Sequence, residues 1–223
     1  MQKIRPKYGV ILVAVAAIVV LGLVGVKGYR WMVKKASQTD ETAFVPEVPD
    51  LKHYATMKER AAAALAVARR QGLREDYCLL VDYSLPSGEP RLTVWSYAEN
   101  KVVDRTYVMH GYGHGGTKEQ PQFSNLLGSR CSALGHMAVT HKHGQRVKRS
   151  YKLRGLDTDN LTVWDRGLMI HPAPWVDMHC FKEYIPLHEK SCEGCVTITT
   201  RGMECIERIM EQQEGEMLLW CYN

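Results

Sequence analysis

A run of 18 residues near the N-terminus, Gly9 to Val26 (GVILVAVAAIVVLGLVGV), contains no charged or strongly polar side chain. As an α-helix rising ~1.5 Å per residue, this run would be roughly 27 Å long, close to the ~30 Å hydrocarbon core of a bilayer. A cleaved signal peptide usually has an apolar region of about 7–15 residues, and here Lys27 and Arg30 follow the run directly. The sequence therefore predicts one uncleaved transmembrane helix within residues 1–35. A cleaved signal peptide and a buried core helix are the alternatives.

The positive charge of the chain is concentrated at the same end. Seven of the 29 Lys and Arg residues lie in residues 1–35, which contain no Asp or Glu. The rest of the chain contains the other 22 basic residues and all 24 acidic residues, so it carries a net charge of −2. A nucleic-acid-binding domain spreads basic charge over its folded surface, and we therefore expect no nucleic-acid partner. Basic residues flank the apolar run on both sides, so the positive-inside rule hardly decides its orientation.

The rest of the chain divides into a linker, a helix and a larger domain. Residues 36–49 are polar, contain two prolines and predict a linker. A helix is expected over 50–72, because Asp50 can cap its start and Gly72 can end it. Residues 73–223 alternate short apolar runs with turns, which predicts a mainly β domain with a second helix at about 202–213. Strands are expected at 77–83, 91–97, 102–109, 136–140, 148–153, 168–171, 195–199 and 217–222.

The densest group of reactive side chains lies in residues 168–198. Cys195 stands between a loop and an apolar strand, and Gly194 before it allows a sharp turn in which backbone N–H groups can point at one spot, as an oxyanion hole requires. An earlier apolar strand ends at His171. A thiol becomes a useful nucleophile when a nearby imidazole takes its proton. The pattern favours a Cys–His pair.

The same cysteine allows two other interpretations. Cys192 and Cys195 have the spacing of a redox pair or of half a zinc site, with His179 and Cys180 as further ligands. A structural zinc site usually has a second ligand pair at comparable spacing, and a thioredoxin-like pair opens a helix after a strand. Neither pattern is present, and no metal is predicted.

Two further segments are rich in one type of residue. The glycine-rich loop 110–116 lacks a following Lys-Ser or Lys-Thr, so it does not predict a phosphate-binding loop. Residues 130–156 are rich in Lys and Arg and contain no acid. They predict a solvated hairpin, with a patch for an anionic polymer or peptide carboxylates as the alternative.

Seven motifs follow one another in an order that resembles a known enzyme family. They are DYS (82–84), MHGYG (109–113), FSN (123–125), GSRCSALG (128–135), GLD with a later Asn (155–157 and 160), MIH (169–171) and CEGCVTI (192–198). Together they resemble the murein L,D-transpeptidase catalytic-domain family, a divergent branch of the YkuD-like group. The resemblance covers about residues 76–222.

This resemblance implies a β-rich catalytic fold and acyl transfer on peptidoglycan stem peptides, with no cofactor. Cys195 matches the family's nucleophile, His171 its general base and Gly194 its oxyanion-stabilising turn. Cys192 stands where the family usually has Ser or Thr. The residues implied on the substrate side are His110, Gly111, Ser129, Ser132, Cys192 and Glu193, with His110 either contacting or orienting the substrate.

The resemblance also implies a location outside the cytoplasm. Residues 9–26 would then anchor the chain in the inner membrane by a single span, with the catalytic domain in the periplasm or outside the cell. The sequence leaves the reaction open between an L,D-transpeptidase and an L,D-carboxypeptidase. A non-catalytic wall-binding or thiol-redox envelope protein on the same scaffold is the alternative class.

Overall fold

The structure, a computed structural model, describes residues 51–143, 149–187 and 192–223 of the chain. The predicted transmembrane helix (9–26) and linker (36–49) lie outside the described residues. Within the described part, no helix is both long enough and apolar enough to cross a bilayer.

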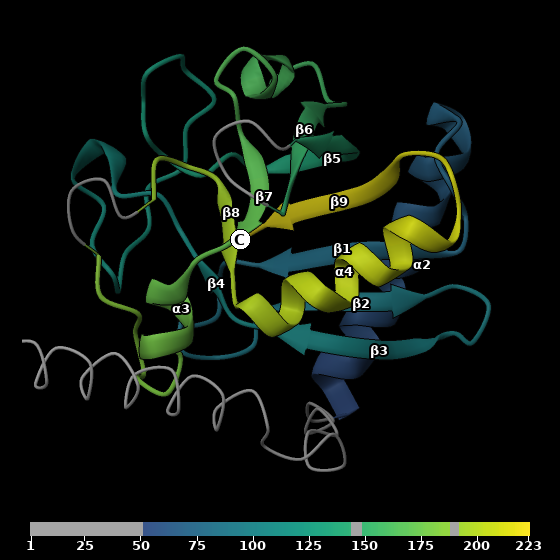
Figure 1. Cartoon of the computed structure of the whole chain (residues 1–223), viewed down its shortest axis with the longest axis horizontal. Helices are drawn as coiled ribbons and strands as arrows, with labels where there is room; N and C mark the ends of the chain where they lie inside the picture. The colour runs from purple at the N-terminus through teal and green to yellow at the C-terminus, as the bar shows by residue number, and fades with distance from the viewer. Residues whose placement is uncertain (1–50, 144–148, 188–191) are drawn as a thin grey trace, which may run out of the picture. The chain divides into compact units, whose positions relative to one another are not determined.

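In the described residues, nine strands form one mixed sheet (Figure 1). The strands are β1 (Tyr77–Asp82), β2 (Leu92–Ser96), β3 (Lys101–Thr106), β4 (Val108–Met109), β5 (Gly135–His143), β6 (Ser150–Gly155), β7 (Met169–Pro172), β8 (Val196–Ile198) and β9 (Met217–Tyr222). Their order in the sheet is β3-β2-β1-β9-β5-β6-β7-β8-β4. The two edge strands, β3 and β4, are separated only by Tyr107, so the sheet curls into a barrel-like shape. The predicted mainly β fold is confirmed.

Two long helices, α2 (Leu51–Gln71) and α4 (Thr200–Gln212), cover opposite faces of the sheet (Figure 1). In β1, Leu79 and Val81 belong to the core cluster that includes the apolar side of α4, whereas Cys78 and Leu80 pack with α2. Alternate side chains of a strand point to opposite faces of the sheet. Because β1 is covered on both faces, it is apolar at four consecutive positions.

The start of α4 is fixed by a side-chain cap. The hydroxyl oxygen of Thr199 accepts a hydrogen bond from the Gly202 backbone N–H at 3.0 Å, as is typical of a threonine N-cap. Met203, Ile206 and Ile209, at helical spacing, are buried. The sequence predicted this helix, and the cap places its first residue two positions earlier than expected.

The structure differs from the sequence predictions in two places. The strand predicted over 102–109 is two strands, because β3 pairs with β2 and β4 pairs with β8. A short helix, α3 (Pro174–His179), lies between the strands predicted at 168–171 and 195–199, where the sequence predicts no helix. Pro174 at the first turn is favourable for a helix start, but six residues are too few to show helical periodicity.

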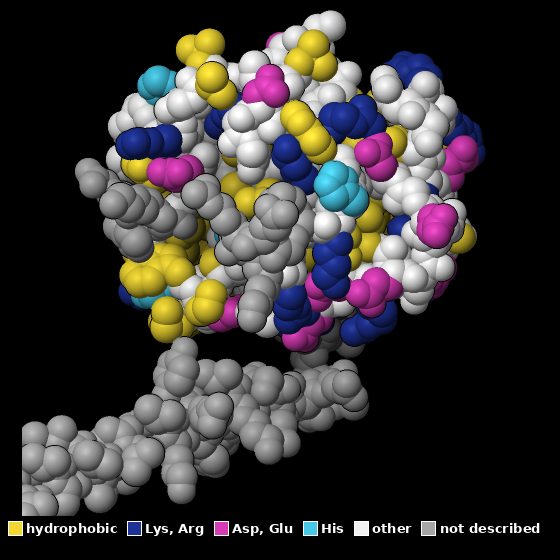
Figure 2. Space-filling view, turned by 45° about the horizontal axis from the view of Figure 1, so that its top comes forward, with side chains coloured by type: hydrophobic (Ala, Val, Ile, Leu, Met, Phe, Trp, Pro, Cys, Tyr) yellow, Lys and Arg dark blue, Asp and Glu magenta, His cyan; other side chains and the backbone are white. Residues whose placement is uncertain are grey.

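The basic segment forms the predicted hairpin, β5 and β6, and several of its half-exposed basic side chains are ion-paired. Lys142 on β5 lies 3.2 Å from Glu207 and 3.3 Å from Glu211, both on α4. Arg149 also pairs with Glu207. On the face shown in Figure 2, Lys and Arg side chains lie among Asp and Glu side chains. The acids of α4 therefore offset basic residues of this hairpin, which weakens the interpretation as a patch for anionic polymers.

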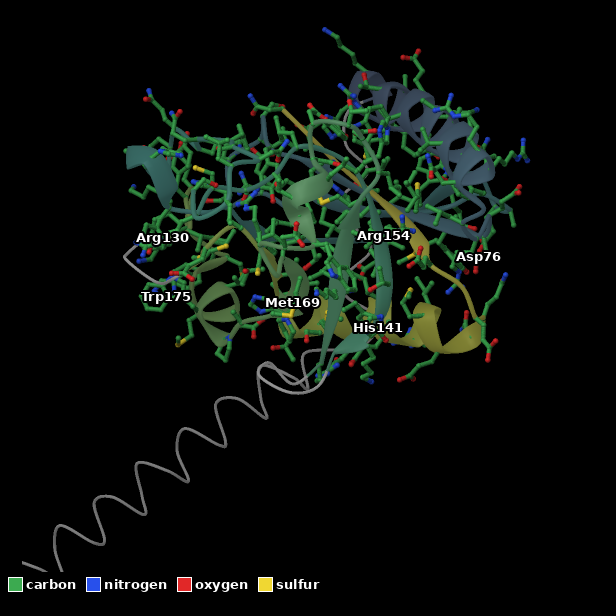
Figure 3. The ribbon with its side chains drawn as sticks, turned by 90° about the horizontal axis from the view of Figure 1, so that it is seen from above. Asp76, Arg130, His141, Arg154, Met169 and Trp175 are labelled. Carbon is green, nitrogen blue, oxygen red and sulfur yellow. The ribbon has the colours of Figure 1, made fainter. Side chains whose placement is uncertain are left out.

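The short strands gather at one end of the domain. Figure 1 shows β4, β8 and α3 together, away from the far end of β1, β2 and β3. Seen from above in Figure 3, Trp175 of α3 and Arg130 lie at the end opposite Asp76, which directly precedes β1. Most of the sequence motifs therefore converge on the end that carries the shortest strands.

Candidate active site

The parallel pair β7 and β8 brings the predicted histidine and cysteine together. His171 on β7 is in register with Thr197 on β8, and Cys195 directly precedes β8. Cys195 lies in the bend before β8, two residues before Thr197, and so stands two positions along the strand pair from His171. His171 is thus a diagonal neighbour of Cys195 across the strand pair, although 24 positions separate them in the sequence.

The hydrogen bonds of His171 determine which ring nitrogen is available. Nδ1 lies 3.0 Å from the Pro172 carbonyl oxygen, which can only accept, so Nδ1 carries the proton. Nε2 faces the hydroxyl of Thr197 at 3.4 Å. Burial lowers the pKa of His171, and the bond to the Pro172 carbonyl opposes this shift only in part. The ring is therefore neutral at physiological pH, and its unprotonated Nε2, which accepts a long hydrogen bond from the Thr197 hydroxyl, is the nitrogen that can take up a proton.

The Cys195 thiol rests in its protonated form. Burial, and next the neighbouring Cys192 thiol, raise the pKa of Cys195 to about 12. A backbone hydrogen bond from Met169 and the charge of Arg166 act in the opposite direction. The pair is neutral at rest, and a base that removes the proton as the sulfur attacks would be required for nucleophilic chemistry.

Gly194 adopts a backbone conformation that only glycine adopts easily. Its φ is +104°, and a Cβ built on it would overlap the carbonyl oxygen of Cys131 and lie 2.9 Å from Arg166 Nη2. The turn before Cys195 is thus pressed against the segment that contains the GSRCSALG motif. This close approach needs a residue without a side chain, as the sequence predicted for an oxyanion-stabilising turn.

Comparison with known families decides the family of this domain. The family model described as L,D-transpeptidase catalytic domain matches residues 50–222. The chain belongs to this family. The match confirms the resemblance and extends it over α2, which lies before the first of the sequence motifs. No curated protein matches the chain. The family makes the chain an L,D-transpeptidase-type enzyme, with peptidoglycan as its general substrate.

Cys192 is a buried part of this L,D-transpeptidase domain. Its sulfur lies 3.2 Å from the Cys195 carbonyl oxygen and 3.4 Å from the Thr197 hydroxyl. All seven cysteines are free thiols in the structure. The described residues contain no group of three or more His, Cys, Asp and Glu side chains that could hold a metal ion. Cys192 therefore lies behind the site, linked through Thr197 to His171.

His110 is held entirely inside the protein. Nε2 donates to the Thr117 carbonyl oxygen at 2.8 Å, and Nδ1 accepts from Arg91 Nη2 at 3.0 Å. Burial, followed by the charge of Arg91, lowers the pKa of His110 to about 4. With 0% of its surface exposed, the ring has an orienting position, and no surface that could contact the substrate.

Of the other predicted substrate-side residues, only one is exposed. Gly111, Ser129 and Ser132 are buried, and the Gly111 N–H donates to the Ser132 hydroxyl at 3.0 Å. Glu193 is exposed, with Tyr112 Oη at 3.4 Å and Arg130 Nε at 3.8 Å from its carboxylate. The motifs thus supply mainly the packed support of the site, and Glu193 marks its surface.

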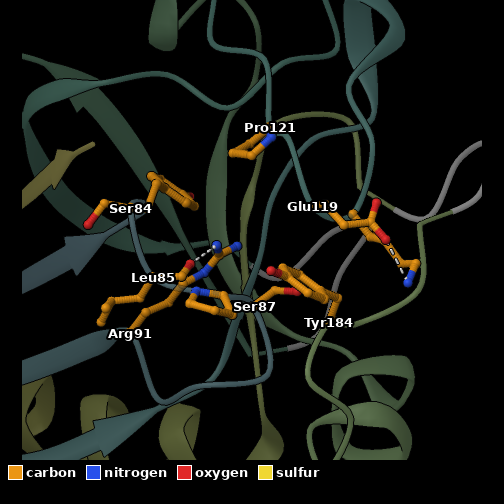
Figure 4. A pocket seen from close by; sticks show the side chains of 10 residues that line it. Ser84, Leu85, Ser87, Arg91, Glu119, Pro121 and Tyr184 are labelled. Atoms are coloured by element: carbon orange, nitrogen blue, oxygen red, sulfur yellow. Dashed lines mark hydrogen bonds and ion pairs between the residues drawn. The ribbon is translucent and has the colours of Figure 1, made fainter.

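A small cavity of about 60 Å³ lies near this support but outside the Cys–His pair (Figure 4). It is lined by the turn after β1, the loop at 118–121 and Tyr184. Cys195, His171 and Gly194 are not among its lining residues. Arg91 lines it and reaches His110 on its other side. The cavity therefore borders the support of the site through the Arg91–His110 contact, and through Tyr83, whose ring packs against Phe123.

Sequence reasoning missed two arginines. Arg91 is buried and donates to the Val108 and Leu85 carbonyl oxygens at 2.9 and 3.0 Å as well as to His110. Arg166 lies just before β7 and affects the Cys195 thiol. Neither belongs to a motif. The only sequence signal was the position of each beside a strand that carries or supports a motif residue.

Proposed function

We propose that this chain is a cysteine-dependent L,D-transpeptidase in which Cys195 forms a thioester with a peptidoglycan stem peptide and His171 is the general base. The parallel register of β7 and β8 supports this most directly, because it brings His171 and the residue that directly precedes β8 to nearby positions on neighbouring strands. The neutral ring with an unprotonated Nε2 and the glycine turn before the sulfur fit the roles of base and oxyanion turn.

The first half of the reaction forms the acyl-enzyme. Nε2 of His171 takes the thiol proton as the Cys195 sulfur attacks the carbonyl carbon that joins an L-centre to a terminal D-amino acid. The carbonyl π electrons move to oxygen, where the backbone N–H of Cys195 can stabilise the charge. When the tetrahedral intermediate collapses, the C–N bond breaks and His171 returns the proton to the leaving amine.

The second half resolves the thioester. Nε2 of His171 takes a proton from the second amine as its nitrogen attacks the thioester carbon. The C–S bond then breaks and the proton passes to the leaving sulfur, which gives the cross-link and restores the Cys195 thiol. If water takes the place of the amine, the product is a shortened peptide and the enzyme acts as an L,D-carboxypeptidase.

We propose that residues 9–26 anchor the enzyme in the cytoplasmic membrane with the catalytic domain outside the cytoplasm. The substrate of the family is in the cell wall, and a tether would hold the enzyme beside it. Alkaline phosphatase fused after Asn223 is active only outside the cytoplasm. An active fusion is the expected result, whereas an inactive fusion together with a bright cytosolic reporter at the same position would reverse the topology.

Trapping of the acyl-enzyme tests the chemistry. The full-length protein is incubated with a tetrapeptide muropeptide or with a carbapenem, and its intact mass and the modified peptide are measured. We expect an adduct on Cys195 in the natural protein and in Cys180→Ala, a matched loss of another partly exposed thiol. In Cys195→Ala we expect neither adduct nor turnover, with activity lower by orders of magnitude.

The same experiment separates the alternatives. A cross-linked dimer of muropeptides identifies a transpeptidase, and a tripeptide product alone identifies a carboxypeptidase. An unmodified Cys195, with muropeptide bound but unchanged, would indicate a wall-binding protein. Full activity of Cys195→Ala would disprove the cysteine mechanism.

A further inference from the structure

Arg166 connects three segments around the candidate nucleophile. It lies between the short 3-10 turn η2 (Leu161–Val163) and β7. Its Nη1 donates to the Ser124 carbonyl oxygen at 2.8 Å, and its Nη2 donates to the carbonyl oxygen of Cys131. The guanidinium therefore ties the segment before β7 to both ends of the loop that contains the FSN and GSRCSALG motifs.

The same guanidinium touches the turn that precedes Cys195. A Cβ on Gly194 would lie 2.9 Å from Arg166 Nη2 and would overlap the Cys131 carbonyl oxygen that Arg166 binds. The guanidinium, the carbonyl and the glycine thus meet at one point. The residue after that point is Cys195, so a shift of Arg166 would alter the position of the sulfur and of its backbone N–H.

The charges around the sulfur make Arg166 distinctive. Cys192 and Glu193 act on Cys195 from its own turn, and Arg166 acts from the segment before β7. His171 lies on β7, the strand next to β8. Of these four groups, only Arg166 carries a permanent positive charge. Both of its hydrogen bonds described above go to backbone carbonyls, which carry no net charge, so these bonds leave the cation unneutralised.

We propose that Arg166 is a positioning residue that holds the Gly194–Cys195 turn in place and supplies the positive charge that stabilises the sulfur when His171 removes its proton. The proposal rests on the proposed role of Cys195. It names the residue whose charge lowers the free energy needed to form the Cys195 thiolate. A cation within about 4–6 Å of an acidic group favours its charged form by roughly 1–3 pH units. Burial disfavours the thiolate here, and Arg166 is the group that opposes burial by charge.

Alkylation of the free thiol tests this proposal without any substrate. The rate at which iodoacetamide modifies Cys195 is followed by peptide mass spectrometry between pH 6 and 11 in the full-length protein. Since the pKa of Cys195 is raised to about 12, this range covers the rising limb of the profile. In Arg166→Gln we expect the rate to fall about tenfold at each pH on that limb, which is equivalent to displacing the limb upwards by about one pH unit. In Arg166→Lys, which keeps the charge and loses the paired hydrogen bonds, we expect a smaller displacement.

The controls separate charge from folding. Arg154→Gln removes a guanidinium that pairs with Glu216, the residue before β9, and its profile should match that of the natural protein. Cys195→Ser gives the background labelling of the other thiols. Melting curves are measured for every variant. An unchanged alkylation profile in folded Arg166→Gln, or loss of the folded state in both Arg166 variants, would overturn the proposal.

This experiment is independent of the proposed reaction. If Cys195→Ala kept its transpeptidase activity, the cysteine mechanism would fail, although the alkylation profile could still depend on Arg166. If the mechanism holds, folded Arg166→Gln should also lose about tenfold in kcat. A fall in kcat without a displaced alkylation profile would contradict a role in stabilising the sulfur.

Discussion

The two sides of β8 carry histidines with opposite environments. On one side, His171 belongs to β7; on the other, His110 directly follows β4. Both ring nitrogens of His110 are engaged in hydrogen bonds: Nδ1 accepts from Arg91, and Nε2 donates to the Thr117 carbonyl oxygen. Neither nitrogen is available to take a proton from a substrate or a thiol. His171 has one nitrogen fixed by the Pro172 carbonyl and the other facing only a hydroxyl at 3.4 Å.

The difference in hydrogen bonding between His171 and His110 indicates which of the two motif histidines is suited to act as a base. A histidine that acts as a base needs a fixed tautomer and one uncommitted nitrogen. His171 has both, whereas His110 has used both nitrogens to hold the buried Arg91 and the loop after β4. In the proposed mechanism, one side of β8 therefore supplies the base and the other side supplies the support.

The largest expected effect comes from replacing each histidine with asparagine. The amide in His171→Asn can still donate to the Pro172 carbonyl but cannot act as a base, so activity should fall about 10²–10⁴-fold with little change in melting temperature. The amide in His110→Asn can still accept from Arg91 but cannot reach Thr117. That variant should lose about 1–3 kcal/mol of stability while activity per folded molecule falls less than tenfold.

Muropeptide turnover and thermal melting of both variants check this prediction. The Asn substitution is matched, since it shortens both side chains equally and leaves one hydrogen bond in each. If His110→Asn lost activity as strongly as His171→Asn while remaining folded, the division between base and support would be wrong. His110 would then take part in catalysis directly.

The second expected effect concerns the glycine turn. Gly194→Ala introduces a Cβ at φ +104° that overlaps the Cys131 carbonyl, so we expect the turn to shift and kcat to fall about 10²–10³-fold, as for a lost oxyanion donor. Gly128→Ala is the control, because Gly128 also has a positive φ of +75° but nothing lies within 4 Å of its Cβ position. Equal losses of kcat in the two variants would show that backbone strain alone, and not the turn at Cys195, accounts for the effect.

Much of this site could be predicted from sequence, because its central residues stand next to features that can be recognised within a short stretch of the chain. Gly194, Cys195 and His171 stand at the ends of apolar runs, and a chain with short strands brings such ends to one edge. The registers of β7 and β8 then follow from their buried residues Ile170 and Val196.

The remaining features depend on contacts that leave no periodic signal. Arg91 reaches His110 across 19 positions, and Arg166 reaches Cys131 across 35. A lone arginine beside a strand is equally typical of a solvated surface, so its burial was visible only in three dimensions. For the same reason, the burial of Ser132 and His110 could not be predicted from motifs that mark them only as family residues.

The third expected effect is a pH dependence of stability. The pKa of His110 is about 4 in the folded protein, against an ordinary value of 6.5. Above pH 6.5 the ring is neutral in both folded and unfolded chains and adds no pH dependence. Between pH 6.5 and about 4 the unfolded chain binds a proton that the folded chain does not, so the free energy of unfolding falls as the pH falls, by on the order of 3 kcal/mol.

Urea unfolding between pH 7.5 and 4 measures this slope. His171, whose pKa is also lowered by burial, adds to it with the same sign. Removing the titrating ring in His110→Asn should flatten the curve more than His171→Asn does. A steeper loss of stability in His110→Asn over this range would contradict the assignment of His110 as the buried, neutral histidine.

The smallest expected effect is at Thr197, which belongs to β8 itself. Its hydroxyl is 3.4 Å from both His171 Nε2 and the Cys192 sulfur, and contacts of that length are weak. Thr197→Val keeps the shape of the side chain and removes the hydroxyl, so we expect kcat to fall only about two- to fivefold. Thr197→Ser should restore it, because the ring then keeps its oriented neighbour. If Thr197→Val were as inactive as His171→Asn, the proton would have to pass through this hydroxyl, and the base would be His171 and Thr197 acting together with the Cys192 thiol behind them.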